Sequence, residues 1–488
     1  MRPWLSRTLI VAATFTACWI GAVWYWRATR RMPDTGDLVI YMVLLPLMLL
    51  LLIWGGGKLF AAASAGSASA AATAAADGAP AAPVHQPAAA LTVLAGALRM
   101  PHGDSAAQLA DAMLSRKASL ALDPELVNDS GYPILTGRAD DVDTDGQQDD
   151  MADWLAEHHP ETHFSDEHWR ALALGNAVAI DLAGELGQHP ALPAYMDAAQ
   201  AGKPLPPLPA LHMITLLPPE WSDAERAAAA AWLRHIVARH GWPQARLSPT
   251  LMAAGNQPAL RLIGQLATQA RQEEQPLLCL ALACGSRIGA ASVQAWADES
   301  ILFDSDHPNG RIPGEGAAGL LLADRTQGAL FEDADAPLMY PANSALRVAS
   351  ADGKARSDVN LLAELAAKAI AEAGLDAVAV TLLTADTDQR GSRMTELLSM
   401  ASATLPELDP GSQVLAVGAA CGDAGAVATV AALVLAQQQV RDGAGPALCI
   451  TNLDPFHRGA VLLAPAAVAT VPTAPAQPAA ATPSTAAA

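Results

Sequence analysis

Two long apolar runs near the N-terminus constrain the fold of this chain more than any other feature. Residues 8–26 and residues 38–57 contain no charged side chain, and each is close to the roughly 20 helical residues that span a bilayer core. Tryptophans lie near the end of both runs, where aromatic rings favour the lipid–water interface. A cleaved signal peptide is the alternative for the first run, but a second run follows at once. We predict a two-helix transmembrane hairpin over residues 1–60, with the lipid bilayer as a partner.

The arginines and lysine around this hairpin are nearly balanced between its turn and its ends, so the positive-inside rule gives little guidance on orientation. We favour both ends on the side of synthesis, because that arrangement does not require a large domain to cross the membrane. The globular part is then expected in the cytoplasm.

Alanine, proline, glycine and serine dominate residues 61–90 and residues 466–488. Such segments bury too little apolar area to offset the entropy of ordering, so we predict a flexible linker and a disordered tail. The remaining residues 91–465 form the globular part.

Composition excludes several classes of protein. Lys and Arg number 29 against 49 Asp and Glu, which gives a net charge of −20 and disfavours nucleic acid as a partner. The five cysteines form no CxxC pair, so neither a disulfide scaffold nor a zinc ribbon is predicted. We expect no cofactor.

Short apolar segments alternate with amphipathic ones along the globular part, which predicts a layered α/β fold with sheets buried on both faces. The segments expected to be extended are residues 91–98, 125–136, 211–217, 277–283, 317–322, 377–383, 414–417, 447–451 and 460–463. The segments expected to be helical are residues 105–114, 169–186, 222–240, 359–373 and 424–438.

The stretch FDSDHPNGRIPGEGAAGLLLAD, residues 303–324, resembles a signature of the β-ketoacyl synthases. The matching residues are Phe303, Asp304, Gly310, Gly314, Glu315, Gly316 and Ala317. The resemblance implies a thiolase-like fold of two related α/β halves, residues 91–325 and 326–465, which enclose buried helices between two mixed sheets, usually as a homodimer.

The catalytic residues of that family do not carry over. The resemblance places its nucleophilic cysteine near Pro258 and Ala259, and its first histidine near Thr384 or Ala385. Its lysine and second histidine fall at Gly418 and Asp423, and its closing glycines at Asp454, Pro455 and Phe456. Because an aspartate at neutral pH can only accept hydrogen bonds, it cannot replace a donating imidazole. We predict that the chain lacks the apparatus for condensation and is not an enzyme of that kind.

Cys421 is the alternative nucleophile, because it precedes a predicted helix whose N-terminus would lower its pKa. Asp423 disfavours this interpretation, since a nearby carboxylate opposes the thiolate and is expected to cap the same helix. Cys279, Cys284 and Cys449 lie in or beside apolar strands and are interpreted as core residues.

Three further features of the sequence suggest roles for particular residues. Asp141, Asp143 and Asp145 spell the start of a calcium loop, but Ala152 replaces its final glutamate, so a solvated acidic loop is the alternative. Four histidines crowd residues 157–169, but Pro160 separates them, which favours a polar surface turn over a zinc site. Glu315 is predicted to be a structural hydrogen-bond acceptor.

Together these observations predict a membrane-anchored, non-catalytic thiolase-like protein that acts as an interaction scaffold. By analogy with thiolase-like proteins beside bacterial secretion loci, a role at a bacterial inner membrane in a type VI-like secretion system is expected, with protein partners of that assembly. The alternatives are an acyltransferase or ketosynthase-like enzyme with a displaced nucleophile, and an acyl or acyl-carrier binding module.

Overall fold

The computed structural model describes residues 90–466, except residues 141, 143–144, 249–250, 253–257, 332, 334 and 354–358. All of the described residues belong to one unit of the chain, His85–Ala488. The predicted hairpin, most of the predicted linker and nearly all of the predicted tail lie outside them. No helix in the described part is both long and apolar enough to cross a membrane.

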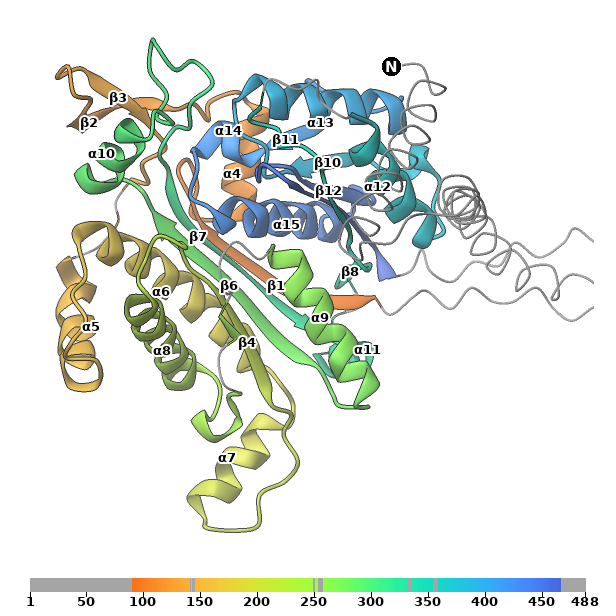
Figure 1. Ribbon diagram of the computed structural model, residues 1–488. Helices are drawn as coiled ribbons and strands as arrows, with labels where there is room; N and C mark the ends of the chain where they lie inside the picture. Colours follow the sequence, from red (N-terminus) through yellow and green to blue (C-terminus); the bar gives the residue numbers. More distant parts are fainter. Residues whose placement is uncertain are drawn as a thin grey trace, which may run out of the picture. The chain divides into compact units, whose positions relative to one another are not determined.

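Eleven strands form the main sheet, which runs through the middle of the fold (Figure 1). Five strands come from the first half of the globular part: β1 (Leu91–Arg99), β4 (Leu211–Leu216), β5 (Leu251–Met252), β6 (Leu278–Ser286) and β7 (Glu315–Ala323). Six come from the second half: β8 (Leu338–Met339), β9 (Asn343–Leu346), β10 (Leu382–Ala385), β11 (Val414–Ala416), β12 (Ala447–Thr451) and β13 (His457–Ala464).

The central strands of the sheet are apolar along their whole length because both faces are covered. In β6, Cys279, Ala281 and Ala283 belong to one core, whereas Leu278 and Leu280 on the opposite face belong to another. This alternation follows from the two-residue period of a strand. A strand buried on both faces therefore reads as one continuous apolar run, as the sequence shows here.

Helices form the layers on either side of the sheet. The described helices are α4 (Ala106–Leu114), α5 (Asp145–His158), α6 (Asp166–Leu186), α7 (Leu192–Gln200), α8 (Asp223–His240), α9 (Ala259–Gln272), α10 (Ala290–Asp298), α11 (Arg325–Gly328), α12 (Val359–Glu372), α13 (Gly391–Thr404), α14 (Val417–Cys421) and α15 (Ala426–Arg441). Helices α6 and α8 cover the outer face of the first half, and α12 and α13 cover that of the second. Helix α15 packs against strands of both halves, so it lies between them.

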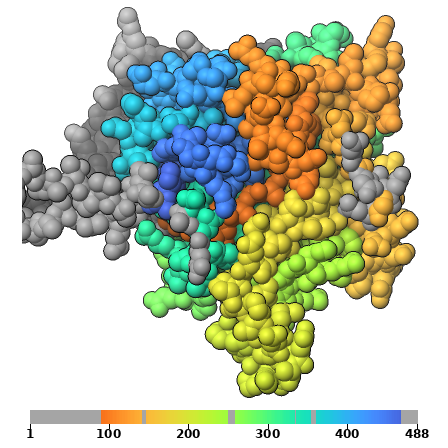
Figure 2. Space-filling view, turned by 180° about the vertical axis from the view of Figure 1, so that it is seen from behind, coloured from red at the N-terminus to blue at the C-terminus, as the bar shows by residue number. Residues whose placement is uncertain are grey.

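The two halves repeat one topology. Strands β7, β6, β4 and β5 pair in the order antiparallel, parallel, parallel, and β13, β12, β10 and β11 pair in the same order. In each half one long helix connects the edge strand to a strand of the antiparallel pair: α9 leads from β5 to β6, and α15 precedes β12. Segments of the two halves also lie side by side on the far face of the molecule, where orange adjoins blue (Figure 2), and α4 contacts α15.

The structure has helices α7, α10 and α13 where none was expected, and it differs from the sequence-based expectations for the strands in three places. The two expected sheets are joined into one, because β8 pairs with β1 on one side and β13 on the other. The segment 377–383 begins as a 3-10 helix, Ala377–Ala379, and its strand is displaced to β10. Residues 121–136 form a separate hairpin of β2 (Ala121–Val127) and β3 (Pro133–Thr136) rather than one extended segment.

Candidate functional site

The N-termini of the two corresponding helices, α9 and α15, open onto one cavity of about 270 Å³. Pro258, Ala259 and Leu260 line it from α9, and Ala426 and Thr429 line it from α15. The loops after β10 and β12 complete the wall. The cavity is therefore assembled from both halves of the repeat.

Several positions singled out in the sequence meet in this cavity, although they lie far apart along the chain. Ala259, Asp423, Asp454 and Pro455 all line it. Ala385 does not, because its side chain is buried within β10, and the next residue along the chain lines the cavity instead. Gly418 and Phe456 are also outside the lining.

Gly418 lies directly against the backbone at the end of β10. A Cβ atom at position 418 would be 2.6 Å from the carbonyl oxygen of Asp386. Real Cβ atoms do not approach a backbone oxygen so closely, because the two overlap sterically. A lysine at this position would therefore require the backbone of α14 or of the β10 loop to move.

Asp386, the first residue after β10, ties three elements together at the cavity wall. Its Oδ1 accepts hydrogen bonds from the backbone N–H groups of Asn452, at 2.7 Å, and Leu453, at 3.1 Å. Its Oδ2 accepts from the hydroxyl of Thr429 at 2.9 Å. Burial raises the pKa of the Asp386 carboxyl to about 6, even though these hydrogen bonds favour the charged form. This carboxyl thus titrates in the mildly acidic range.

Asp423 and Arg287 form a buried ion pair at the cavity wall. Arg287 Nη1 lies 3.0 Å from Asp423 Oδ1, and its Nη2 lies 2.7 Å from Glu220 Oε1. The guanidinium also lies 5.2 Å from the centroid of the Trp296 ring, within cation–π range. Burial acts to raise the pKa of Asp423, but Arg287 and Arg311 hold it below its ordinary value. Asp423 is therefore an ionised acceptor and not a proton donor.

The first part of the ketosynthase-like segment forms the loop that positions Arg311 at the cavity. Asp304 Oδ1 accepts the backbone N–H of His307 at 2.6 Å, and the N–H of Phe303 donates to the carbonyl of Arg311 at 2.9 Å. Arg311 lines the cavity, and its guanidinium lies 3.8 Å from Asp423 Oδ2. The segment therefore contributes a cation to the site.

The glycines of the same segment allow two backbones to touch. The N–H of Gly314 donates to the carbonyl of Asp423 at 3.2 Å. A Cβ at position 314 would lie 2.4 Å from the carbonyl oxygen of Cys421, and one at position 316 would lie 2.4 Å from Met100 Sδ. Glycine is required at position 314 because its backbone lies against that of residues 421–423, and this close approach sets the position of Asp423.

Substituting Gly314 by alanine is therefore expected to lower the free energy of unfolding by about 1–3 kcal/mol, the usual range for overpacking. At the exposed position Gly264 of α9, an added Cβ would meet no other atom within 4 Å. Gly264→Ala should instead stabilise the helix by about 0.5–1 kcal/mol. Urea titration of both variants in mild detergent measures the difference. Equal effects of the two substitutions would contradict the close approach at Gly314.

Glu315 is buried behind the cavity and does not line it. Its Oε1 accepts the backbone N–H of Ala139 at 2.9 Å, and its Oε2 accepts Arg170 Nε at 2.9 Å and the hydroxyl of Ser286 at 3.0 Å. Arg170 Nη2 adds a second contact to Oε1, so the pair is bidentate. Glu315 is thus placed as a buried hydrogen-bond acceptor away from the cavity.

A second group of charges fixes the loop after β12. Arg390 Nη1 and Arg393 Nη2 lie 2.8 and 2.7 Å from the same oxygen of Asp352. Both arginines also donate to the carbonyl of Leu453 at 3.2 Å. Burial lowers the pKa of Arg393 to about 10, with the nearby Arg390 acting in the same direction. This network holds the cavity wall in place.

Cys421 lacks the geometry that a nucleophile at a helix N-terminus requires. It is the last residue of the short helix α14, where the N-terminal dipole cannot favour a thiolate, and it does not line the cavity. Burial raises the pKa of its thiol to about 12, as it does for Cys279, Cys284 and Cys449.

Asp423 was expected to cap the helix that follows Cys421, and its contact differs slightly from that expectation. Its Oδ1 accepts the N–H of Gly425 at 2.9 Å. Gly425 is itself the residue that precedes the first turn of α15. The carboxylate therefore fixes the entry to the helix without accepting an N–H from within it.

The remaining candidates are placed as follows. Asp141 and Asp143 lie outside the described residues, and Asp145 begins α5 with its side chain also outside them. His168 accepts the N–H of Ser165 at the start of α6, so it acts as a capping residue. In the part of the chain that the structure describes, no three His, Cys, Asp or Glu side chains converge on a metal position.

Sequence reasoning missed five of the charged residues in the cavity: Glu220, Arg287, Arg311, Asp386 and Arg390. Asp386 and Arg390 carry a signal that could have found them, because they follow directly on an apolar strand whose parallel neighbours end at the same edge. Loops at the carboxyl ends of parallel strands are common sites of binding. Arg287 and Arg311 have no comparable signal, since their roles depend on contacts made far along the chain.

No protein-family model and no curated protein matches this chain. Among solved structures, the ketosynthase from module 6 of the bacillaene synthase of Bacillus subtilis 168 is similar at 13% identity, with a TM-score of 0.52 over 77% of this chain and 72% of that one. The ketosynthase from module 1 of the bacillaene synthase of Bacillus amyloliquefaciens FZB42 is similar at 13% identity, with a TM-score of 0.51 over 80% and 75%. The fold is that of a ketosynthase domain. The predicted thiolase-like α/β fold is confirmed, whereas identity this low carries no statement about activity.

Proposed function

We propose that this chain is a ketosynthase-like binding module that does not catalyse condensation. The observation that carries the proposal is the composition of the cavity at the N-termini of α9 and α15. Among the described residues that line it there is no cysteine, and Ala259 occupies the start of α9. A thiolate at a helix N-terminus is the usual arrangement for covalent chemistry of this type.

The charges around the cavity support binding rather than turnover. Arg287 is paired with Asp423 and Glu220, and Arg390 is paired with Asp388 and Asp352. The guanidinium groups and Asp423 held in such pairs are poor proton donors at neutral pH, because each pair favours their charged state. The pairs instead give a rigid, polar wall that can recognise a small ligand or the side chain of a partner.

The alternative enzyme with Cys421 as nucleophile lacks a supporting observation, since that thiol is buried and outside the cavity. Tethering of the module to a membrane through residues 8–26 and 38–57 remains part of the proposal and rests on the sequence. An assembly role at that membrane follows from the same sequence argument.

Acylation of the full-length protein tests the proposal. After incubation in mild detergent with an acetyl thioester of N-acetylcysteamine, intact-mass spectrometry should show no acetyl adduct on the wild-type chain. An adduct that maps to a residue of the cavity would overturn the proposal, because it would identify a working nucleophile.

A matched variant checks that the cavity is accessible. Ala259→Cys places a thiol at the N-terminus of α9, where the dipole lowers its pKa. We expect iodoacetamide to alkylate this introduced thiol in the folded protein. The native thiols of the described part should stay unmodified because burial raises their pKa values; they are Cys279, Cys284, Cys421 and Cys449. Peptide mapping separates all of these positions from Cys18.

A further inference from the structure

Two adjoining cavities flank helix α9, and the smaller one shares Leu260 with the candidate site. One has a volume of about 540 Å³ and the other about 490 Å³, and both are lined by Leu91, Ala267 and Arg271. The larger cavity shares no lining residue with the site at the helix N-termini. Volumes of this size suit a small organic ligand.

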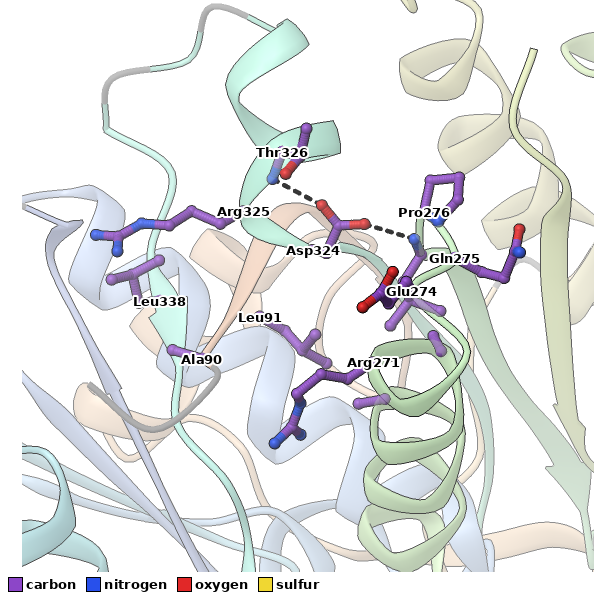
Figure 3. A pocket seen from close by; sticks show the side chains of 13 residues that line it. Ala90, Leu91, Arg271, Glu274, Gln275, Pro276, Asp324, Arg325, Thr326 and Leu338 are labelled. Atoms are coloured by element: carbon purple, nitrogen blue, oxygen red, sulfur yellow. Dashed lines mark hydrogen bonds between the residues drawn. The ribbon is translucent and has the colours of Figure 1, made fainter. Parts of the chain in front are cut away.

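Three arginines line the two cavities without carboxylate partners. Arg271 and Arg325 line the larger one, and Arg261 and Arg271 line the smaller one. Within the described ranges, no ion pair or side-chain hydrogen bond involves any of the three, although many other arginines of the chain are paired. In Figure 3 the guanidinium groups of Arg271 and Arg325 end freely, with Leu91 between the two side chains in this view.

The three arginines stay unpaired at these cavities although the chain has a net charge of −20 and offers carboxylates in excess. Free guanidinium groups attract an external anion, and their fork of N–H donors matches the oxygens of a phosphate. The arrangement therefore favours an anionic ligand at this place.

The two carboxylates at the larger cavity offset only part of this charge. Asp324 Oδ1 accepts the backbone N–H groups of Thr326 and Gln327, and its Oδ2 accepts that of Leu277 at 2.5 Å (Figure 3). These hydrogen bonds hold the Asp324 carboxylate between the end of β7 and the start of α11, and its negative charge remains. Glu274 is the other carboxylate in the lining and is exposed.

We propose that these two cavities form a binding site for a phosphate monoester attached to an uncharged body. Three arginines against the carboxylates of Asp324 and Glu274 leave one positive charge in the lining, which favours an anion. The guanidinium fork suits the oxygens of a phosphate monoester. Leu91, Ala267 and Leu338 provide apolar surface for the rest of the ligand. A lipid headgroup and a soluble ester share this chemistry.

Titration of the full-length protein in dodecyl maltoside micelles tests the proposal, with sn-glycerol 3-phosphate, dihexanoylphosphatidic acid and zwitterionic dihexanoylphosphatidylcholine as probes. We expect one or both phosphate monoesters to bind and the phosphatidylcholine to bind at least about tenfold more weakly. Binding of glycerol 3-phosphate identifies a soluble ester as sufficient, whereas binding of phosphatidic acid alone identifies a lipid. Absence of binding by both monoesters would overturn the proposal.

Variants at the site give a second readout. The double substitution Arg271→Ala and Arg325→Ala should raise Kd by about 100-fold, or about tenfold for each lost charge-assisted contact. Glu274→Gln should lower Kd, because it removes the opposing charge without the loss of a buried group. Lys203→Ala removes an exposed charge outside both cavities and should leave Kd unchanged. If the arginine and glutamate variants all bind as the wild type does, the site is wrong.

Because these probes and variants leave Ala259 and the cavity of the candidate site untouched, the outcome is independent of the acylation experiment.

Discussion

Replacing Glu315 with alanine is expected to lower the free energy of unfolding by about 3–5 kcal/mol, the range for breaking a buried ion pair by removing one partner. Glu315 is fully buried and accepts hydrogen bonds from Arg170, Ser286 and the backbone of Ala139. Its loss leaves all three donors without this acceptor in the interior, and each unpaired buried group adds to the cost. Urea titration in mild detergent measures the change.

Asp181→Ala provides the control for Glu315. Asp181 also accepts from an arginine, Arg99, at 2.7 Å, but its side chain is 45% exposed. Exposed pairs of this kind contribute at most about 1 kcal/mol. A result in which both substitutions cost the same would show that Glu315 is not the buried anchor described here.

Replacing Asp386 with asparagine is expected to make the protein more stable than the wild type at pH 7, by up to about 3 kcal/mol. The folded-state pKa of Asp386 is raised from 3.8 to about 6 by burial. The wild type therefore keeps the stabilising contribution of this group below about pH 4 and loses it as pH rises through about 6. At about 1.4 kcal/mol for each pKa unit, the shift of roughly 2 units gives the stated magnitude.

Asparagine is the appropriate substitute because it fits the same hydrogen bonds. Its oxygen can accept from the backbone N–H groups of Asn452 and Leu453, and its amide can donate to the Thr429 hydroxyl. Since the amide does not titrate, the difference in unfolding free energy between variant and wild type should grow from about pH 4 to about pH 7. A difference that stays constant over this range would contradict the raised pKa.

Asp123→Asn should give the opposite sign. Burial acts to raise the pKa of Asp123, but Arg138 and backbone N–H groups lower it to about 2. Its contribution is present above about pH 4 and is lost as pH falls toward about 2. The Asp123 variant should thus be less stable than the wild type at pH 7. Comparing the two variants therefore distinguishes a carboxyl whose pKa is raised by folding from one whose pKa is lowered.

Much of the architecture could be predicted from the sequence because both faces of the sheet are buried. Continuous apolar runs such as residues 277–283 leave few alternatives to a buried strand, and the structure has β6 there. The bounds of short strands were harder to predict from the sequence. Residues 377–383 are apolar, but the chain first forms a 3-10 turn after Asp376, and the strand begins only at Leu382.

The candidate site was predicted in part. The ketosynthase-like register brought Ala259 and Asp423 to one cavity, as their common lining shows. The charged residues that give the cavity its character could not be found in the same way. Arg287 and Asp423 are 136 residues apart, and no local spacing rule reports a pair that only the tertiary fold brings together.

The geometry of β8 determines how the folded unit would respond to tension. Met339 pairs with Leu91 at the start of β1 and with Leu463 near the end of β13, so the chain enters and leaves on either side of one two-residue strand. Each strand is held much more extensively on its other side, β1 by β7 and β13 by β12. A pull applied to both ends at once would therefore load the seam at β8 first, while the packing of α15 against β6 and β7 still holds the two halves together.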